Sequence, residues 1–173
     1  MSADVPGTVR VLRPGDHVPR CSAQRVSVIA QQRFGGETGE TEMPFEVLNI
    51  GPACSLRGYP TVAFRDKRGV IPFVAVHGGR YVTGAAPETL LVPKSATARF
   101  LVAKYRCDIA VQRQSTTLEV GLPGTARPQA VHTTAQQLIK PVTYCASTSQ
   151  ASESGNVLYV SPIEPDVADT YAR

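Results

Sequence analysis

The sequence predicts an all-β sandwich of about seven to nine strands that is held by disulfide bonds. Short runs of β-branched and apolar residues recur along the chain. Fourteen glycines and fourteen prolines separate these runs, which favours a turn-rich β domain over a helical one. Four cysteines, an even number with wide spacing, are typical of a structural disulfide framework. With 173 residues and no tryptophan, the chain has one domain's length, and its core rests on Val, Leu, Ile and Ala.

The predicted strands follow one another at intervals typical of a sandwich. Alternation is clear where Phe45 and Val47 share one face, and where Leu118 and Val120 point inward. In order, the predicted strands cover residues 8–12, 25–34, 45–50, 61–65, 70–77, 96–105, 116–120, 138–142 and 157–162.

The segments between the strands read as turns and loops. Residues 35–42 form an acidic, flexible loop, and residues 66–69 form a turn with Gly at its end. Residues 146–156, rich in Ser, Thr and Gly, are expected to form an exposed loop or hairpin tip. Helical signal is weak, with one or two turns expected at residues 133–139 and one at 166–171.

The cysteines Cys21, Cys54, Cys107 and Cys145 include no CxxC pair, which disfavours a zinc ribbon or a thioredoxin-like redox motif. Four cysteines allow three pairings. We expect Cys21–Cys54 and Cys107–Cys145, because each closes a loop of moderate length. The alternative is four buried free thiols in a cytosolic protein.

The sequence contains no catalytic, cofactor or metal signature, and we expect neither an enzyme nor a cofactor. The three histidines lie far apart, and Glu37, Glu40 and Glu42 lack the spacing of a calcium loop, so a solvated acidic tip is favoured. The formal net charge is +4. The N-terminal arginines form no run and are not interleaved with aromatics, which argues against nucleic acid as a partner. These arginines are Arg10, Arg13, Arg20 and Arg25.

The segment from Asn49 to Pro60 carries the most informative local pattern. Cys54 would hold the turn after a core strand, and Gly58 can adopt a positive φ without steric cost. Tyr59 offers an apolar ring and a hydroxyl for a backbone carbonyl, as in the tyrosine corner of sandwiches. Pro60 then fixes the entry into the next strand. A ligand-stacking role for Tyr59 is the functional alternative.

The run Asn49-x-Gly51-x-x-Cys54-x-Leu56-Arg57-Gly58-Tyr59-Pro60 resembles the signature of a family of domains of unknown function numbered 4232. The resemblance covers about residues 21–162, from the first cysteine to the closing strand. It implies an immunoglobulin-like sandwich outside the cytoplasm, as in actinobacterial secreted proteins and lipoproteins, and it implies no activity. The sequence departs from the family's pattern in having no recognisable leader and in carrying an N-terminal arm.

We therefore expect an extended arm at residues 1–20, a sandwich domain at 21–162 and a tail at 163–173. The expected function is a non-catalytic, secreted or cell-surface module that binds a protein, glycan or lipid partner. The alternative is a structural component of an extracellular assembly, such as an actinobacteriophage virion. No run is long enough to span a membrane. The candidate partner-contact strand could add to a neighbour's sheet edge or cover its own sheet; it comprises Thr8, Val9, Arg10, Val11 and Leu12.

Overall fold

The computed structural model describes residues 7–31, 34–35, 40–79, 81–105, 112–115, 117–133, 142–145 and 155–172. It confirms the all-β prediction, since the described residues form strands and two 3₁₀ turns, η1 (Ala23–Arg25) and η2 (Val167–Thr170). The longer strands are β2 (Val26–Ala30), β4 (Glu40–Asn49), β6 (Thr61–Asp66), β8 (Val74–His77), β10 (Thr97–Tyr105), β12 (Thr117–Gly121) and β16 (Val157–Val160). The shorter strands are β1 (Arg10–Val11), β3 (Phe34–Gly35), β5 (Cys54–Leu56), β7 (Gly69–Val70), β9 (Leu90–Val92), β11 (Gln112–Gln114), β13 (Gln129–Ala130), β14 (His132–Thr133) and β15 (Thr143–Cys145).

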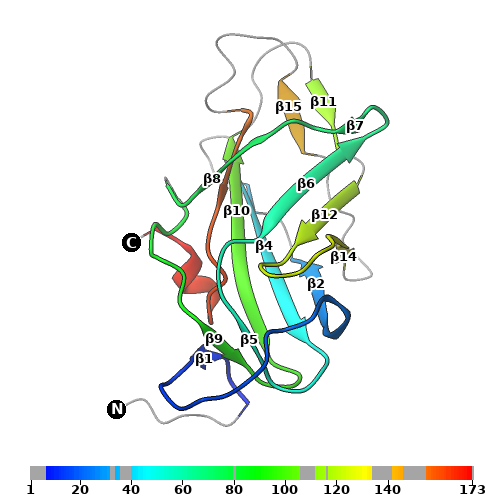
Figure 1. Ribbon diagram of the computed structural model, residues 1–173. Helices are drawn as coiled ribbons and strands as arrows, with labels where there is room; N and C mark the ends of the chain where they lie inside the picture. Colours follow the sequence, from blue (N-terminus) through cyan, green and yellow to red (C-terminus); the bar gives the residue numbers. More distant parts are fainter. Residues whose placement is uncertain are drawn as a thin grey trace.

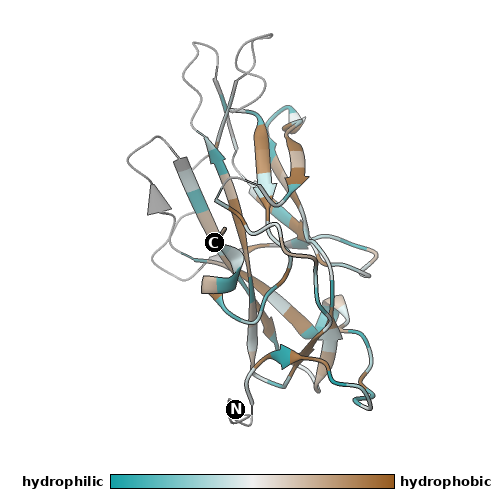
Figure 2. Ribbon diagram, turned by 90° about the vertical axis from the view of Figure 1, so that its left-hand side faces the viewer, coloured by the Kyte–Doolittle hydropathy of each residue, from teal (hydrophilic) through white to brown (hydrophobic). Residues whose placement is uncertain are grey.

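The largest sheet has the order β14-β2-β4-β10-β16-β8, and β3 also pairs with β4. Its centre is the long antiparallel ladder between β4 and β10, which runs from Thr97 opposite Leu48 to Tyr105 opposite Glu40. The two outermost pairings, β14 with β2 and β16 with β8, are parallel. Polar and apolar segments follow one another along the strands, as expected where one face of a sheet is buried (Figure 2).

Three smaller sheets complete the described part of the fold, with the orders β1-β9-β5, β13-β12-β6-β7 and β11-β15. Strands β5, β6 and β12 lie in front of β4 and β10 in the view of Figure 1. Phe45 and Phe100 of the large sheet stack with ring centroids 4.7 Å apart. They share one buried cluster with Phe64, Leu90 and Val120 of the smaller sheets. The two layers therefore enclose a common core, and the narrower assignment to the immunoglobulin-like class stays a prediction.

Some predicted boundaries were wrong. The predicted strand at 70–77 is two strands, because Pro72 has no N–H to donate and Ile71 turns into the core. The predicted strand at 25–34 likewise divides into β2 and β3. The predicted acidic loop at 35–42 overlaps strands at both ends, because Gly35 belongs to β3 and β4 begins at Glu40, where it pairs with Tyr105 of β10. Residues 36–39 lie outside the described residues.

Other predictions are only partly covered by the described residues. Thr133 ends β14 instead of starting a helical turn, and residues 134–141 lie outside the described residues. Residues 146–154 of the predicted loop lie outside them as well. The turn at residues 66–69 is confirmed, since the Asp66 carboxylate accepts a hydrogen bond from the Arg68 N–H. The predicted C-terminal turn is η2. None of the described helices is long and apolar enough to cross a membrane.

Candidate functional site

The predicted disulfide between Cys21 and Cys54 is present, with an S–S distance of 2.01 Å and a Cα–Cα distance of 4.8 Å. It joins the segment before β2 to strand β5, and both side chains are buried in the core. Cys107 and the side chain of Cys145 lie outside the described residues, so the second disulfide stays a prediction.

Asn49 is fully buried and holds together three segments of backbone. Its side-chain N–H groups donate to the carbonyls of Pro52, Val92 and Pro93, at 2.8, 2.9 and 3.2 Å. Its side-chain oxygen accepts a hydrogen bond from the Gly51 N–H at 2.9 Å. This residue fastens the loop after β4 to the end of β9, which gives the motif a structural role at this position.

The Gly58-Tyr59-Pro60 segment adopts the predicted geometry. Gly58 has a φ of 120°, and a Cβ at this position would lie 3.2 Å from the Pro123 side chain. The Tyr59 hydroxyl donates to the Ala85 carbonyl at 3.3 Å, which confirms the predicted anchor to backbone. Pro60 is buried and leads directly into β6. The Tyr59 ring also stacks on the ring of His77, with centroids 3.8 Å apart, and this contact was not predicted.

The predicted partner-contact strand pairs within its own chain. Of residues Thr8 to Leu12, Arg10 and Val11 form β1 opposite Leu91 and Leu90 of β9. The Leu12 N–H continues this attachment by donating to the Thr89 carbonyl at 2.7 Å. Because β1 stands at the end of the β1-β9-β5 sheet, its outer edge alone remains as a contact for another chain. A partner contact at Thr8–Leu12 stays a prediction for that edge.

The edge strand β8 is the most exposed apolar strand of the described structure. All four of its residues are exposed, with Val74 at 58% and Val76 at 36%. Val76 lies opposite Tyr159 of β16, and Tyr81, exposed at 38%, follows β8 closely in the chain. Strand β8 ends the order of the large sheet, so among the described strands it has β16 as its one neighbour.

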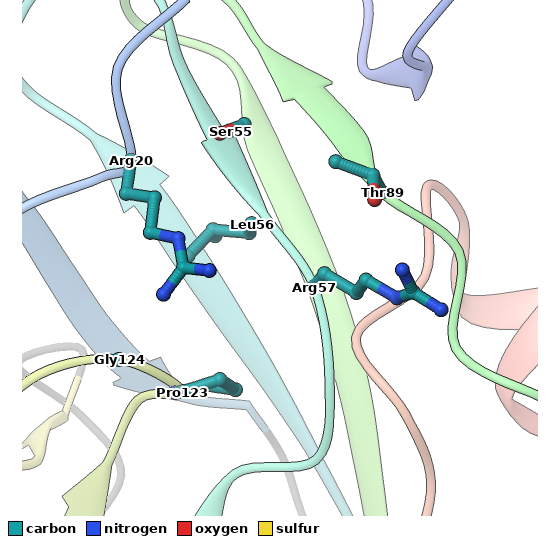
Figure 3. A pocket seen from close by; sticks show the side chains of 7 residues that line it. All are labelled: Arg20, Ser55, Leu56, Arg57, Thr89, Pro123 and Gly124. Atoms are coloured by element: carbon teal, nitrogen blue, oxygen red, sulfur yellow. The ribbon is translucent and has the colours of Figure 1, made fainter.

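A hollow of about 220 Å³ opens beside β5, between the N-terminal segment and the turn at Pro123 and Gly124. Arg20 extends toward that turn, and Arg57 extends toward the segment that carries Thr89 (Figure 3). The full lining comprises Arg20, Ser55, Leu56, Arg57, Thr89, Pro123 and Gly124. It brings together an N-terminal arginine and the arginine of the signature segment, which sequence reasoning had treated separately.

Several buried or partly buried ionisable side chains lie outside the hollow, and they were not predicted from the sequence. Asp66 and Arg113 form a two-bond ion pair with both N–O distances at 2.7 Å, and its hydrogen bonds lower the pKa of Asp66 to about 2. Burial raises the pKa of Glu164 to about 7, with added repulsion from Asp169 and Glu88. Lys104 is buried on β10, where its amine donates to the Tyr105 carbonyl and lies 5.8 Å from the centre of the Phe73 ring.

The residues considered for metal binding are only partly described by the structure. His17 is exposed, His77 lies against Tyr59, and the side chain of His132 is outside the described residues. Glu42 accepts a hydrogen bond from the Tyr171 hydroxyl at 3.1 Å, whereas Glu37 and the side chain of Glu40 are not described. Within the described ranges, no group of three or more His, Cys, Asp or Glu side chains is arranged to hold a metal ion.

The fold and these sites define an all-β domain with a disulfide that ties its N-terminal segment to strand β5. A family model described as a domain of unknown function, DUF4232, matches residues 21–164. The chain belongs to this family, and the resemblance seen in the signature segment is confirmed. No curated protein and no solved structure matches the chain.

Proposed function

We propose that this protein is a non-catalytic binding module outside the cytoplasm, and that it holds a partner protein by adding a strand to β8. The open edge of β8 is the observation that carries this proposal. A location of the protein outside the cytoplasm is supported by the Cys21–Cys54 disulfide, because such bonds persist in oxidising compartments.

The hydrogen-bonding pattern of β8 favours a strand as the ligand. The N–H groups of Val74 and Gly78 donate to Asn156 and Val160 on the β16 side. Since successive backbone groups alternate in direction, the N–H and C=O groups of Ala75 and His77 point to the opposite edge. In the described part of the structure, no strand occupies that edge. An extended segment of another chain can complete these hydrogen bonds.

The side chains of β8 favour a protein partner over a glycan or a lipid. Residues 74–77 include no Asp, Glu, Lys or Arg, although charges commonly protect exposed edges from pairing. Val74 and Val76 project from one face, next to Val157 and Tyr159 on β16. Apolar side chains at alternate positions of a bound strand would pack on this row.

Photo-crosslinking tests the proposal in the full chain, expressed in its native host. A benzoylphenylalanine at Val76 should give an adduct with a different protein in the extracytoplasmic fraction. The same group at Val70, which is 49% exposed on β7, is the matched control and should give none. A second variant carries Val74→Lys together with the benzoylphenylalanine at Val76. It should give no adduct, because the lysine places a charge on the contact face, and its circular dichroism spectrum should be unchanged.

Three results would overturn the proposal. The first is an adduct at Val76 that persists with Val74→Lys. The second is recovery of the protein in the cytosol with alkylatable thiols at Cys21 and Cys54. The third is an adduct with twice the mass of the chain, which would point to contacts between identical copies and so to the structural-assembly alternative.

A further inference from the structure

The hollow beside β5 is built on a fixed frame. The Cys21 N–H donates to the Ser55 carbonyl at 3.0 Å, and the Ser55 N–H donates to the Pro19 carbonyl at 2.8 Å. These bonds and the adjacent disulfide fix the backbone of Arg20 against β5. Arg57 follows β5 directly and precedes Gly58. Both guanidinium groups are thus carried by ordered backbone on two sides of one hollow.

Unlike four other arginines of the described structure, the two arginines of the hollow form no ion pair with a described residue. Four arginines in the described structure form ion pairs with Asp or Glu; they are Arg10, Arg65, Arg99 and Arg113. Among the described residues, Arg20 and Arg57 have neither an ion pair nor a side-chain hydrogen bond. The seven lining residues include no carboxylate. The hollow therefore has two positive charges that no carboxylate of the described residues balances.

The wall between these charges is partly apolar. Leu56 lies between the side chains of Arg20 and Arg57 in Figure 3, and Pro123 also lines the hollow. A ligand that spans the two arginines would lay its middle on this wall and its ends against the two guanidinium groups. A carboxylate matches the planar fork of a guanidinium and carries one negative charge. Two carboxylates would balance two arginines, whereas two phosphate groups would exceed them.

We infer that this hollow is a binding site for a ligand with two carboxylate groups joined by an apolar spacer. The ligand is either a free dicarboxylic acid or a pair of acidic side chains on a peptide, since both present the same chemistry. The volume of the hollow, about 220 Å³, suits a ligand of this small size. The site lies on strands other than β8, so it stands or falls independently of the proposed strand addition.

Calorimetric titration of the full chain at low ionic strength tests this inference. The probes are succinate, glutarate, adipate and suberate, with butyrate and inorganic phosphate for comparison. One dicarboxylate should bind at least about tenfold more tightly than butyrate and phosphate, because only it engages both arginines. Arg20→Gln and Arg57→Gln should each reduce its affinity by about tenfold or more. Arg68→Gln, an exposed arginine of the β6–β7 turn, makes the same charge change outside the hollow and should leave the affinity unchanged.

Equal binding of butyrate and all dicarboxylates would overturn the inference, as would phosphate binding that matches the best dicarboxylate. A loss of affinity in Arg68→Gln equal to that in Arg57→Gln would also overturn it, because attraction by net charge would then explain the binding. A capped peptide with two glutamates separates the two sources. Tighter binding of the peptide than of any free acid assigns the site to a protein ligand, and the reverse order assigns it to a metabolite.

Discussion

Removal of the Cys21–Cys54 disulfide should cost about 3–4 kcal/mol of unfolding free energy. The two cysteines are 33 residues apart in sequence. On the chain-entropy relation, a loop of that length restricts the unfolded chain by about 3.7 kcal/mol at 25 °C. A small domain has about 5–15 kcal/mol of total stability, so the variant would retain its fold with a much lower urea midpoint.

The assay is urea unfolding of the native chain and of the double variant Cys21→Ala, Cys54→Ala, followed by circular dichroism. Alanine is preferred to serine because both sites are buried and a hydroxyl would require a new hydrogen bond. The double variant leaves Cys107 and Cys145 untouched, which reduction with a thiol would not. A loss below about 1 kcal/mol with an unchanged urea dependence would refute the loop-entropy argument.

Two further predictions follow from buried polar groups. Asn49→Asp should lower the unfolding free energy by about 3 kcal/mol or more at neutral pH, because a carboxylate cannot donate to the carbonyls of Pro52, Val92 and Pro93; a loss under about 1 kcal/mol by urea unfolding would contradict the assigned role. Glu164 has its pKa raised from 4.5 to about 7, so its contribution to stability is present below pH 4.5 and is lost as the pH rises through 7. The full difference corresponds to about 3 kcal/mol, which solvent screening reduces to about 1–2 kcal/mol. Glu164→Gln should therefore stabilise the protein by about that amount at pH 8 and leave it nearly unchanged at pH 4.5, and equal effects at both values would rule out this titration.

The local sequence pattern was sufficient to predict the fold class and several details of the strands. Alternating apolar residues placed β10 within a residue of its observed start and placed Leu118 and Val120 in the core. The same alternation puts Lys104 on the inner face of β10, although an amine in the core is not expected from residue type alone. The break between β7 and β8 could have been predicted from Pro72, since proline has no N–H to donate to a neighbouring strand.

The sites depend on contacts between distant parts of the chain, and these could not be read from the sequence. The motif containing Asn49 was recognised, but its partners Val92 and Pro93 are 43 and 44 residues further on. Arg20 and Arg57 meet at one hollow because a disulfide and two backbone hydrogen bonds fix the N-terminal segment against β5. The exposure of β8 follows from its position in the sheet order and not from its apolar composition, which predicts burial.

The place of β16 in the large sheet determines the order in which that sheet can be completed. β16 lies between β10 and β8, and its first residue, Val157, pairs with Val74. A ribosome makes β8 and β10 well before β16, so a nascent chain already has both strands but lacks the strand that lies between them. Closing so long a loop is slow, because its entropy is lost before the contacts form. Until Val157–Val160 has been synthesised, the strand edges of β8 and β10 are both open to other chains, and a chaperone that covers apolar strands would act on this protein in that interval.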